Sequence, residues 1–184
     1  MSFNMINKLP TPEELASIYN VSTTGLRYKN ECDSILLDIL SGHSKKFLII
    51  VGPCSADNED AILNYTSRLA ALQEIVKDQI LLLPRLYSSK PRSLGVGYKG
   101  LLHQPNPQKK DDLLNGLIAT RKLHLHVLEQ TGMTGADEIL YPENWEYLSD
   151  IVSYIAVGAR SVEDQFHRFT VSGCDVPCGM KNPT

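Results

Sequence analysis

Five side chains that could bind or polarise a charged substrate each follow a short apolar run of the sequence. They are Cys54, Arg85, Glu138, Arg160 and Lys181. Arginine and lysine form strong, charge-assisted hydrogen bonds with phosphate and carboxylate groups. A thiol beside them is a nucleophile or a soft metal ligand if it has partners, and otherwise a small apolar residue. The pattern therefore predicts a site for a phosphorylated or carboxylate ligand, built from separate segments.

A single cation at the end of an apolar run is often an ordinary solvated or ion-paired surface residue. Three at successive strand ends are harder to explain in that way, because neighbouring parallel strands lie about 4.8 Å apart and uncompensated cations repel each other. A dianionic ligand removes that repulsion. The segment 87–108, rich in proline and glycine, adds Lys90-Pro91-Arg92-Ser93 and Lys99, which could hold a second phosphate.

The apolar pattern predicts alternating strands and helices that position these residues. Continuous apolar runs indicate buried strands at 47–51, 80–83, 136–140, 155–159 and 176–180. Apolar residues at helical spacing indicate helices at 62–76, 114–128, 145–155 and 161–172. Two helices precede the first strand: one opens at a capping box of Thr11 and Glu14, and the other covers 32–40 and is closed by Gly42. We expect an N-terminal helical extension over 1–44 and a strand–helix domain over 45–184.

Repeated strand–helix units predict a parallel α/β sheet, either doubly wound or part of a (β/α)8 barrel. The glycine fingerprint of dinucleotide-binding sheets does not follow the first strand, and the Walker phosphate loop is absent from the sequence. In both architectures the ligand lies outside the carboxyl ends of the strands. The five side chains above are therefore expected to face one pocket.

The composition argues against several other classes of protein. The 184 residues are 42% apolar and carry a formal charge of −3, so no overall basic field exists to attract nucleic acid. Apolar runs stay well short of the roughly 20 residues that cross a bilayer, and the first ten residues lack the pattern of a signal peptide. The four cysteines are few and irregularly spaced, which is untypical of a secreted disulfide framework. We expect a cytoplasmic protein with neither a membrane nor a nucleic acid as its partner.

Five ordered motifs together resemble one enzyme family, the class I 3-deoxy-D-arabino-heptulosonate 7-phosphate (DAHP) synthases. The resemblance runs from about Ser41 to the final residue, and the order and approximate spacing of the blocks both fit. The motifs are Gly52-Pro53-Cys54-Ser55, Arg85 with Lys90-Pro91-Arg92-Ser93, Gly158-Ala159-Arg160, Gln165 with His167-Arg168, and Gly179-Met180-Lys181-Asn182. The resemblance implies a (β/α)8 barrel of which about five of eight strand–helix units are present.

The resemblance also implies a reaction, the condensation of phosphoenolpyruvate with erythrose 4-phosphate in the first step of the shikimate pathway. Phosphoenolpyruvate would be held through its carboxylate and phosphate by Arg85, Arg160 and Lys181, with Glu138 and Lys99 beside them as further substrate-binding residues. The aldehyde substrate would be held by Lys90, Arg92 and Ser93. The catalytic residues implied are Cys54, Arg85, Lys90 and Lys181. Cys54 would also be one ligand of a divalent metal of the manganese, iron, cobalt or zinc class.

The other metal ligands of the family come from its late strands, so we expect a truncated synthase that is inactive alone. One alternative is a non-catalytic fragment that binds phosphorylated ligands, associates with itself or associates with an intact synthase. Another is an unrelated phosphate-binding α/β domain. The five ordered blocks favour the synthase.

Overall fold

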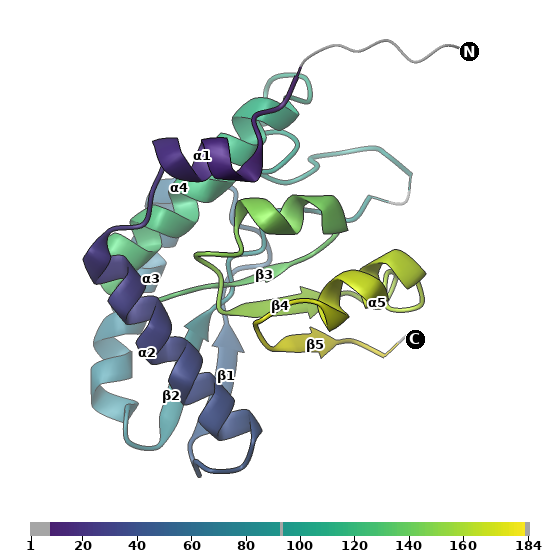
Figure 1. Cartoon of the computed structure of the whole chain (residues 1–184). Coiled ribbons are helices and arrows are strands. Elements are labelled where there is room, and N and C mark those ends of the chain that lie inside the picture. Colours follow the sequence, from purple (N-terminus) through teal and green to yellow (C-terminus); the bar gives the residue numbers. More distant parts are fainter. Residues whose placement is uncertain (1–7, 93, 183–184) are drawn as a thin grey trace.

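The computed structural model describes residues 8–92 and 94–182, which form two parallel sheets with helices around them (Figure 1). In the first sheet β1 (Phe47–Val51) pairs with β2 (Ile80–Pro84). The second sheet has the order β3 (Ala136–Glu138), β4 (Tyr154–Val157) and β5 (Cys178–Met180). All neighbours are parallel and follow the order of the sequence. This confirms the predicted parallel α/β fold. The order shows no reversal of the doubly wound kind and suits an arc of a (β/α) barrel.

The two sheets meet at a seam between β2 and β3. Its backbone link in the described residues is one isolated bridge between Arg85 and Ala136, with the Leu86 N–H donating to the Ala136 carbonyl at 2.8 Å. Below the bridge, the side chain of Gln73 hydrogen-bonds the Ile80 carbonyl and the Leu82 N–H, at 2.9 and 2.6 Å. An amide side chain thus takes the place of a neighbouring strand. The sheets splay apart at this seam, so that β1 and β2 point up the page in Figure 1 and β4 and β5 across it.

The N-terminal helices are set by their caps, as the sequence predicts. In α1 (Pro12–Ile18) the Thr11 side chain accepts from the Glu14 N–H, and the Glu14 carboxylate accepts from the Thr11 N–H. α2 (Thr23–Leu40) begins earlier than predicted, because Ser22 caps it through the Gly25 N–H. Gly42, with φ 78°, follows its C-terminus in the left-handed conformation that glycine adopts without strain.

Helices α2 and α3 (Glu59–Val76) cover opposite faces of the first sheet. Leu36 of α2 is fully buried against Leu81 and Leu83, whereas Leu69 of α3 packs against Leu82. This alternation follows from the period of two along a strand. β2 is therefore buried on both faces, which explains its continuous apolar sequence.

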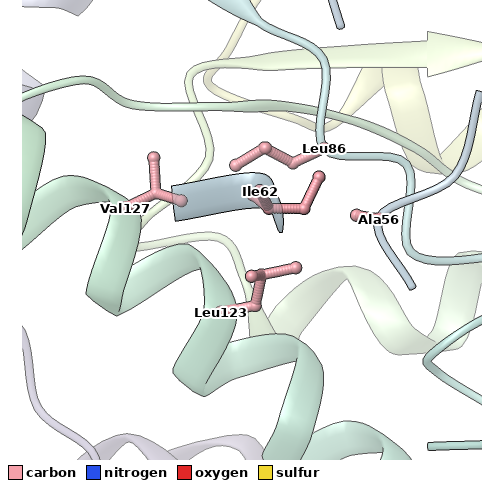
Figure 2. Close-up of a cluster of buried hydrophobic side chains, with 5 residues drawn as sticks. All are labelled: Ala56, Ile62, Leu86, Leu123 and Val127. Carbon is pink, nitrogen blue, oxygen red and sulfur yellow. The ribbon is translucent and has the colours of Figure 1, made fainter. Parts of the chain in front are cut away.

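A core cluster anchors the segments that follow β1 and β2. Ala56, Ile62, Leu86, Leu123 and Val127 pack together, with Ile62 on α3 and the last two on α4 (Leu113–Thr131) (Figure 2). The Ala56 N–H also donates to the Tyr87 carbonyl at 2.9 Å. The cluster fixes the backbone within two residues of Cys54 and Arg85.

Two predicted helices differ from the structure. The expected helix at 145–155 is a short 3-10 helix, η1 (Pro142–Tyr147), followed by turns. The apolar residues there have helical spacing, but the buried guanidinium of Arg121 binds the Tyr147 carbonyl and the Asp150 carboxylate, which holds this segment in an irregular path. The helix expected from 161 begins only at Gln165 in α5 (Gln165–Ser172), because Asp164 caps it through the His167 N–H.

Strand ends differ by a few residues. β3, β4 and β5 each stop two residues or fewer from the predicted ends. The long segment between β2 and α4 forms no helix or strand in the residues described there, as predicted. Among the described residues, none of the helices combines the length and the hydropathy needed to cross a membrane.

Candidate functional site

A cleft of about 360 Å³ lies at the carboxyl ends of the strands. Six of the predicted site residues line it: Cys54, Arg85, Lys90, Glu138, Arg160 and Lys181. They follow β1, β2, β4 and β5 or end β3, apart from Lys90, which belongs to the loop after β2. The parallel arrangement thus brings together side chains up to 127 residues apart, since all five strands end at the same edge.

Two of the cations lie over the face of the aromatic ring of Tyr87. The Arg85 guanidinium carbon lies 3.9 Å from the ring centroid, and the Lys181 ammonium lies 5.5 Å from it. Tyr87 is 5% exposed, and burial raises the pKa of its phenol, with the Glu138 charge acting in the same direction. The neutral ring attracts both cations through its face and limits their positions without neutralising them. Their charge remains available to an anion.

Glu138 is the carboxylate of the cleft lining, and its surroundings pull its protonation in opposite directions. Burial raises the pKa of this carboxyl, and the charges of Lys181 and Arg85 partly oppose the rise. The Lys181 ammonium lies 3.9 Å from its Oε1 atom. Gly158 makes room for it, since a Cβ atom there would lie 2.4 Å from the same oxygen. The carboxyl group therefore sits among cations, with its position set by close packing.

Cys54 and Lys90 form a direct pair at the mouth of the cleft. The Lys90 ammonium donates to the Cys54 sulfur at 2.9 Å and to its carbonyl at 2.7 Å. This hydrogen bond and the charge of Lys90 lower the pKa of the exposed Cys54 thiol, and Arg85 and Arg92 add to the effect. Thiolate is the form that reacts and binds metals.

The remaining predicted residues lie in the loop after β2. Arg92 is exposed and donates through Nε to the Tyr98 carbonyl at 2.8 Å. Lys99 does not line the cleft, because its ammonium pairs with the Asp111 carboxylate. The backbone of Lys99 nevertheless lies close to the cleft residue Lys90, since the Lys99 carbonyl accepts from the Lys90 N–H at 3.1 Å. Ser93 lies outside the described residues.

Metal ligands do not gather around Cys54 in the described part of the chain. No group of three or more His, Cys, Asp or Glu side chains is placed there to hold a metal ion. A single cysteine, already hydrogen-bonded to a lysine, does not fit a catalytic metal site, which needs at least three protein ligands.

Sequence reasoning missed three residues of this region: Tyr87, Ser89 and Asp137. Tyr87 and Ser89 lie two and four residues after Arg85, at the spacing that points side chains to one side of extended backbone, so the signal was present. Asp137 is 6% exposed and lies immediately before Glu138. Its position inside an otherwise apolar run was a further signal, because a buried carboxylate needs partners.

Taken together, the cleft can bind a small anion with two acidic groups. Four cations and one carboxyl group surround the cleft, strand ends position all of these groups except Lys90, and two of the cations lie over an aromatic ring. The arrangement suits electrostatic stabilisation of phosphate and carboxylate groups.

Comparison with known proteins identifies a family. The family model described as the DAHP synthetase I family matches residues 17–184. The Tyr-sensitive phospho-2-dehydro-3-deoxyheptonate aldolase of Escherichia coli (strain K12) is 36% identical over 176 residues, covering 96% of this chain and 49% of that protein. The phospho-2-dehydro-3-deoxyheptonate aldolase of Corynebacterium glutamicum is 35% identical over 179 residues, covering 97% and 48%.

A solved structure supports the same assignment. The phospho-2-dehydro-3-deoxyheptonate aldolase of Francisella tularensis SCHU S4 superposes with a TM-score of 0.93 at 27% identity, covering 100% of this chain and 53% of that one. The chain spans about half the length of the curated relatives named above. From the match to the family model and the similarity of these relatives, the chain belongs to the DAHP synthetase I family.

Proposed function

We propose that this chain provides the phosphoenolpyruvate-binding side of a DAHP synthase, the enzyme that condenses phosphoenolpyruvate with erythrose 4-phosphate and releases phosphate. The observation that carries the proposal is the cleft itself, in which Arg85, Arg160, Lys181 and Lys90 converge from separate elements. Membership of the family supports the choice of substrate.

Each residue has a part that follows from its position. The guanidinium groups of Arg85 and Arg160 can form forked hydrogen bonds with the carboxylate and the phosphate. Lys181, held between Glu138 and the Tyr87 ring, adds a point charge. These fixed cations stabilise the negative charge that develops on the phosphate as it leaves. Lys90, which lines the cleft, and the exposed Arg92 of the same loop would hold the aldehyde substrate.

Binding of phosphoenolpyruvate to the purified chain tests the proposal. Isothermal titration calorimetry should show saturable binding that inorganic phosphate weakens by competition. Arg160→Met should weaken binding by about tenfold or more, the equivalent of one charge-assisted hydrogen bond. Arg68→Met is the matched control, since Arg68 is exposed on α3 and does not line the cleft. Absence of binding by the native chain, or equal affinity of the Arg160 variant, would contradict the proposal.

A second candidate is a binding module that works beside an intact synthase. It is favoured by one observation: the described residues bring anion-binding side chains together but no cluster of metal ligands. Addition of the chain to an intact synthase separates the two candidates. A change in the activity or assembly of that synthase would favour the module, and no change would favour the first candidate. The chain alone, given phosphoenolpyruvate, erythrose 4-phosphate and manganese, should bind without turnover, and turnover would contradict both candidates.

A further inference from the structure

A buried carboxylate closes the seam between the two sheets directly behind the cleft. Asp137, on β3, is 6% exposed, and Ser88, in the segment after β2, is 3% exposed. Asp137 Oδ1 accepts from the Ser88 N–H at 2.9 Å, and Oδ2 accepts from the Ser88 hydroxyl at 2.7 Å. A parallel ladder continued past the Arg85–Ala136 bridge would offer Ser88 a backbone carbonyl of β3. Here a side chain takes that position.

The same carboxylate binds two further groups. Oδ1 also accepts from the Glu138 N–H at 2.7 Å, and Oδ2 lies 3.3 Å from Nε2 of His124, which is 1% exposed on α4. An imidazole with its proton on Nε2 donates to this carboxylate oxygen, which accepts. Asp137 thus joins the ends of two strands and a helix through four donors.

The groups that Asp137 joins line the cleft or lie next to residues that position it. Ser88 lies between Tyr87, whose ring two of the cations contact, and Ser89, which lines the cleft. On the other side of the seam, Asp137 holds the backbone of Glu138, whose carboxyl group faces Lys181. One wall of the cleft therefore belongs to the first sheet and the other wall to the second.

We infer that Asp137 is a positioning residue for the anion cleft: its carboxylate, bound to Ser88, the Glu138 backbone and His124, sets the spacing between the two walls. The inference rests on the proposed function and adds to it a residue that does not itself line the cleft. A ligand with two acidic groups needs both walls at the right separation, whereas inorganic phosphate can bind to one.

Burying a carboxylate is costly, and this supports a role in positioning. Removing a charged group from water without partners costs several kcal/mol, so a seam between apolar strands is more simply closed by backbone hydrogen bonds or apolar packing. The charge also acts on its neighbours, since Asp137 is one of the causes that raise the pKa values of Glu138 and Tyr87.

The test compares the affinities of two probes, phosphoenolpyruvate and inorganic phosphate, by calorimetry. Asp137→Asn keeps the shape of the side chain but removes its charge and replaces one acceptor oxygen with a donor. We expect its phosphoenolpyruvate affinity to fall roughly tenfold, as for one lost charge-assisted hydrogen bond, and its phosphate affinity to fall less than threefold. Asp150→Asn is the matched control, because Asp150 pairs with buried Arg121 and does not line the cleft. It should destabilise the chain and leave the ratio of the two affinities unchanged.

The possible outcomes separate the two proposals. A native chain that binds no phosphoenolpyruvate overturns the proposed function, and this inference with it. A native chain that binds, with an Asp137→Asn variant whose affinity ratio stays within twofold of native, overturns the positioning role alone. If circular dichroism shows Asp137→Asn to be unfolded, Ser88→Ala takes its place, since it removes a single hydroxyl donor. It should shift the ratio in the same direction by a smaller factor, and an unchanged ratio in that variant also overturns the inference.

Discussion

Replacing Arg121 should destabilise the whole chain, because its buried side chain joins segments far apart in the sequence. Arg121 is 1% exposed and lies on α4. Its Nε donates to the Tyr19 carbonyl at 2.8 Å, and Nη1 donates to the Tyr147 carbonyl at 2.9 Å. Nη1 and Nη2 form a fork with the two Asp150 oxygens at 2.8 and 2.7 Å. The guanidinium therefore ties the link between α1 and α2 to the end of η1.

The expected size of the effect follows from these contacts. Breaking a buried ion pair costs about 3–5 kcal/mol, and the lower end applies because the Asp150 side chain is 39% exposed and can turn to water. The Tyr147 carbonyl, left without this donor, adds about 1 kcal/mol. Arg121→Met, which keeps the apolar stem, should thus lower the free energy of unfolding by roughly 4 kcal/mol. With an m-value of about 2 kcal/mol/M, the urea midpoint falls by about 2 M.

Two probes of urea unfolding make the test specific. Trp145, the single tryptophan of the chain, lies in η1, so its fluorescence reports on the tied segment, while far-UV circular dichroism reports on all helices. Both midpoints should coincide in the native chain and fall together in Arg121→Met. Exposed Arg68→Met is the control and should change the free energy by less than about 0.5 kcal/mol. A loss below 1 kcal/mol in Arg121→Met would refute the reasoning. Separate transitions would favour the predicted division into an extension over 1–44 and a domain over 45–184.

Four further predictions concern the cleft and the sheet edges. Gly158→Ala should push the Glu138 carboxylate aside and weaken phosphoenolpyruvate binding by about tenfold in calorimetry. Gly173→Ala is the control, because its Cβ atom would meet nothing nearer than 3.6 Å, and it should bind as the native chain does. Glu138→Gln should raise the melting temperature at neutral pH. Burial raises the pKa of Glu138, so its contribution to stability is present below the unfolded pKa and is lost as pH rises through the folded pKa. The higher melting temperature of the variant should therefore vanish at acidic pH, and an equal increase at all pH values would exclude this cause. Cys54 should react with iodoacetamide faster than an ordinary thiol at neutral pH, because the Lys90 ammonium lowers the pKa of the thiol. Lys90→Met should slow the reaction at least several-fold, and an unchanged rate would show that the contact has no such effect. The outer edges of β1 and β5 have no partner strand in the described residues, so we expect concentration-dependent self-association in sedimentation velocity, and a monomer at all concentrations would contradict this.

The sequence was sufficient for the order of the elements and for most of the cleft. Apolar runs closed by Gly-Pro or by a cation mark buried parallel strands, and the carboxyl ends of such strands must share one edge. Arg85, Arg160 and Lys181 were found in this way, and they line one cleft. The same logic holds for the capping box at Thr11 and for Gly42 after the second helix, because a cap depends on local backbone geometry alone.

Contacts between distant segments were beyond the reach of these patterns. Residues 145–155 have the spacing of a helix, yet Arg121, more than 20 positions earlier, holds them in turns. Lys99 pairs with Asp111 across an irregular loop, so sequence order alone could not place its ammonium outside the cleft. Asp137 appeared as one polar position in a strand, and its four donors come from three different elements.

The Gln73 side chain gives the N-terminal half of β2 a hydrogen-bond partner that a single side-chain rotation would remove. Rotation of this one amide would free the Ile80 carbonyl and the Leu82 N–H, leaving half of a strand edge open while the β1–β2 ladder stays intact. In amide hydrogen exchange, Leu82 should therefore exchange by local opening, well before the amides bonded to β1. This opening needs no global unfolding, and exchange should reveal it at the edge of β2 that Gln73 covers.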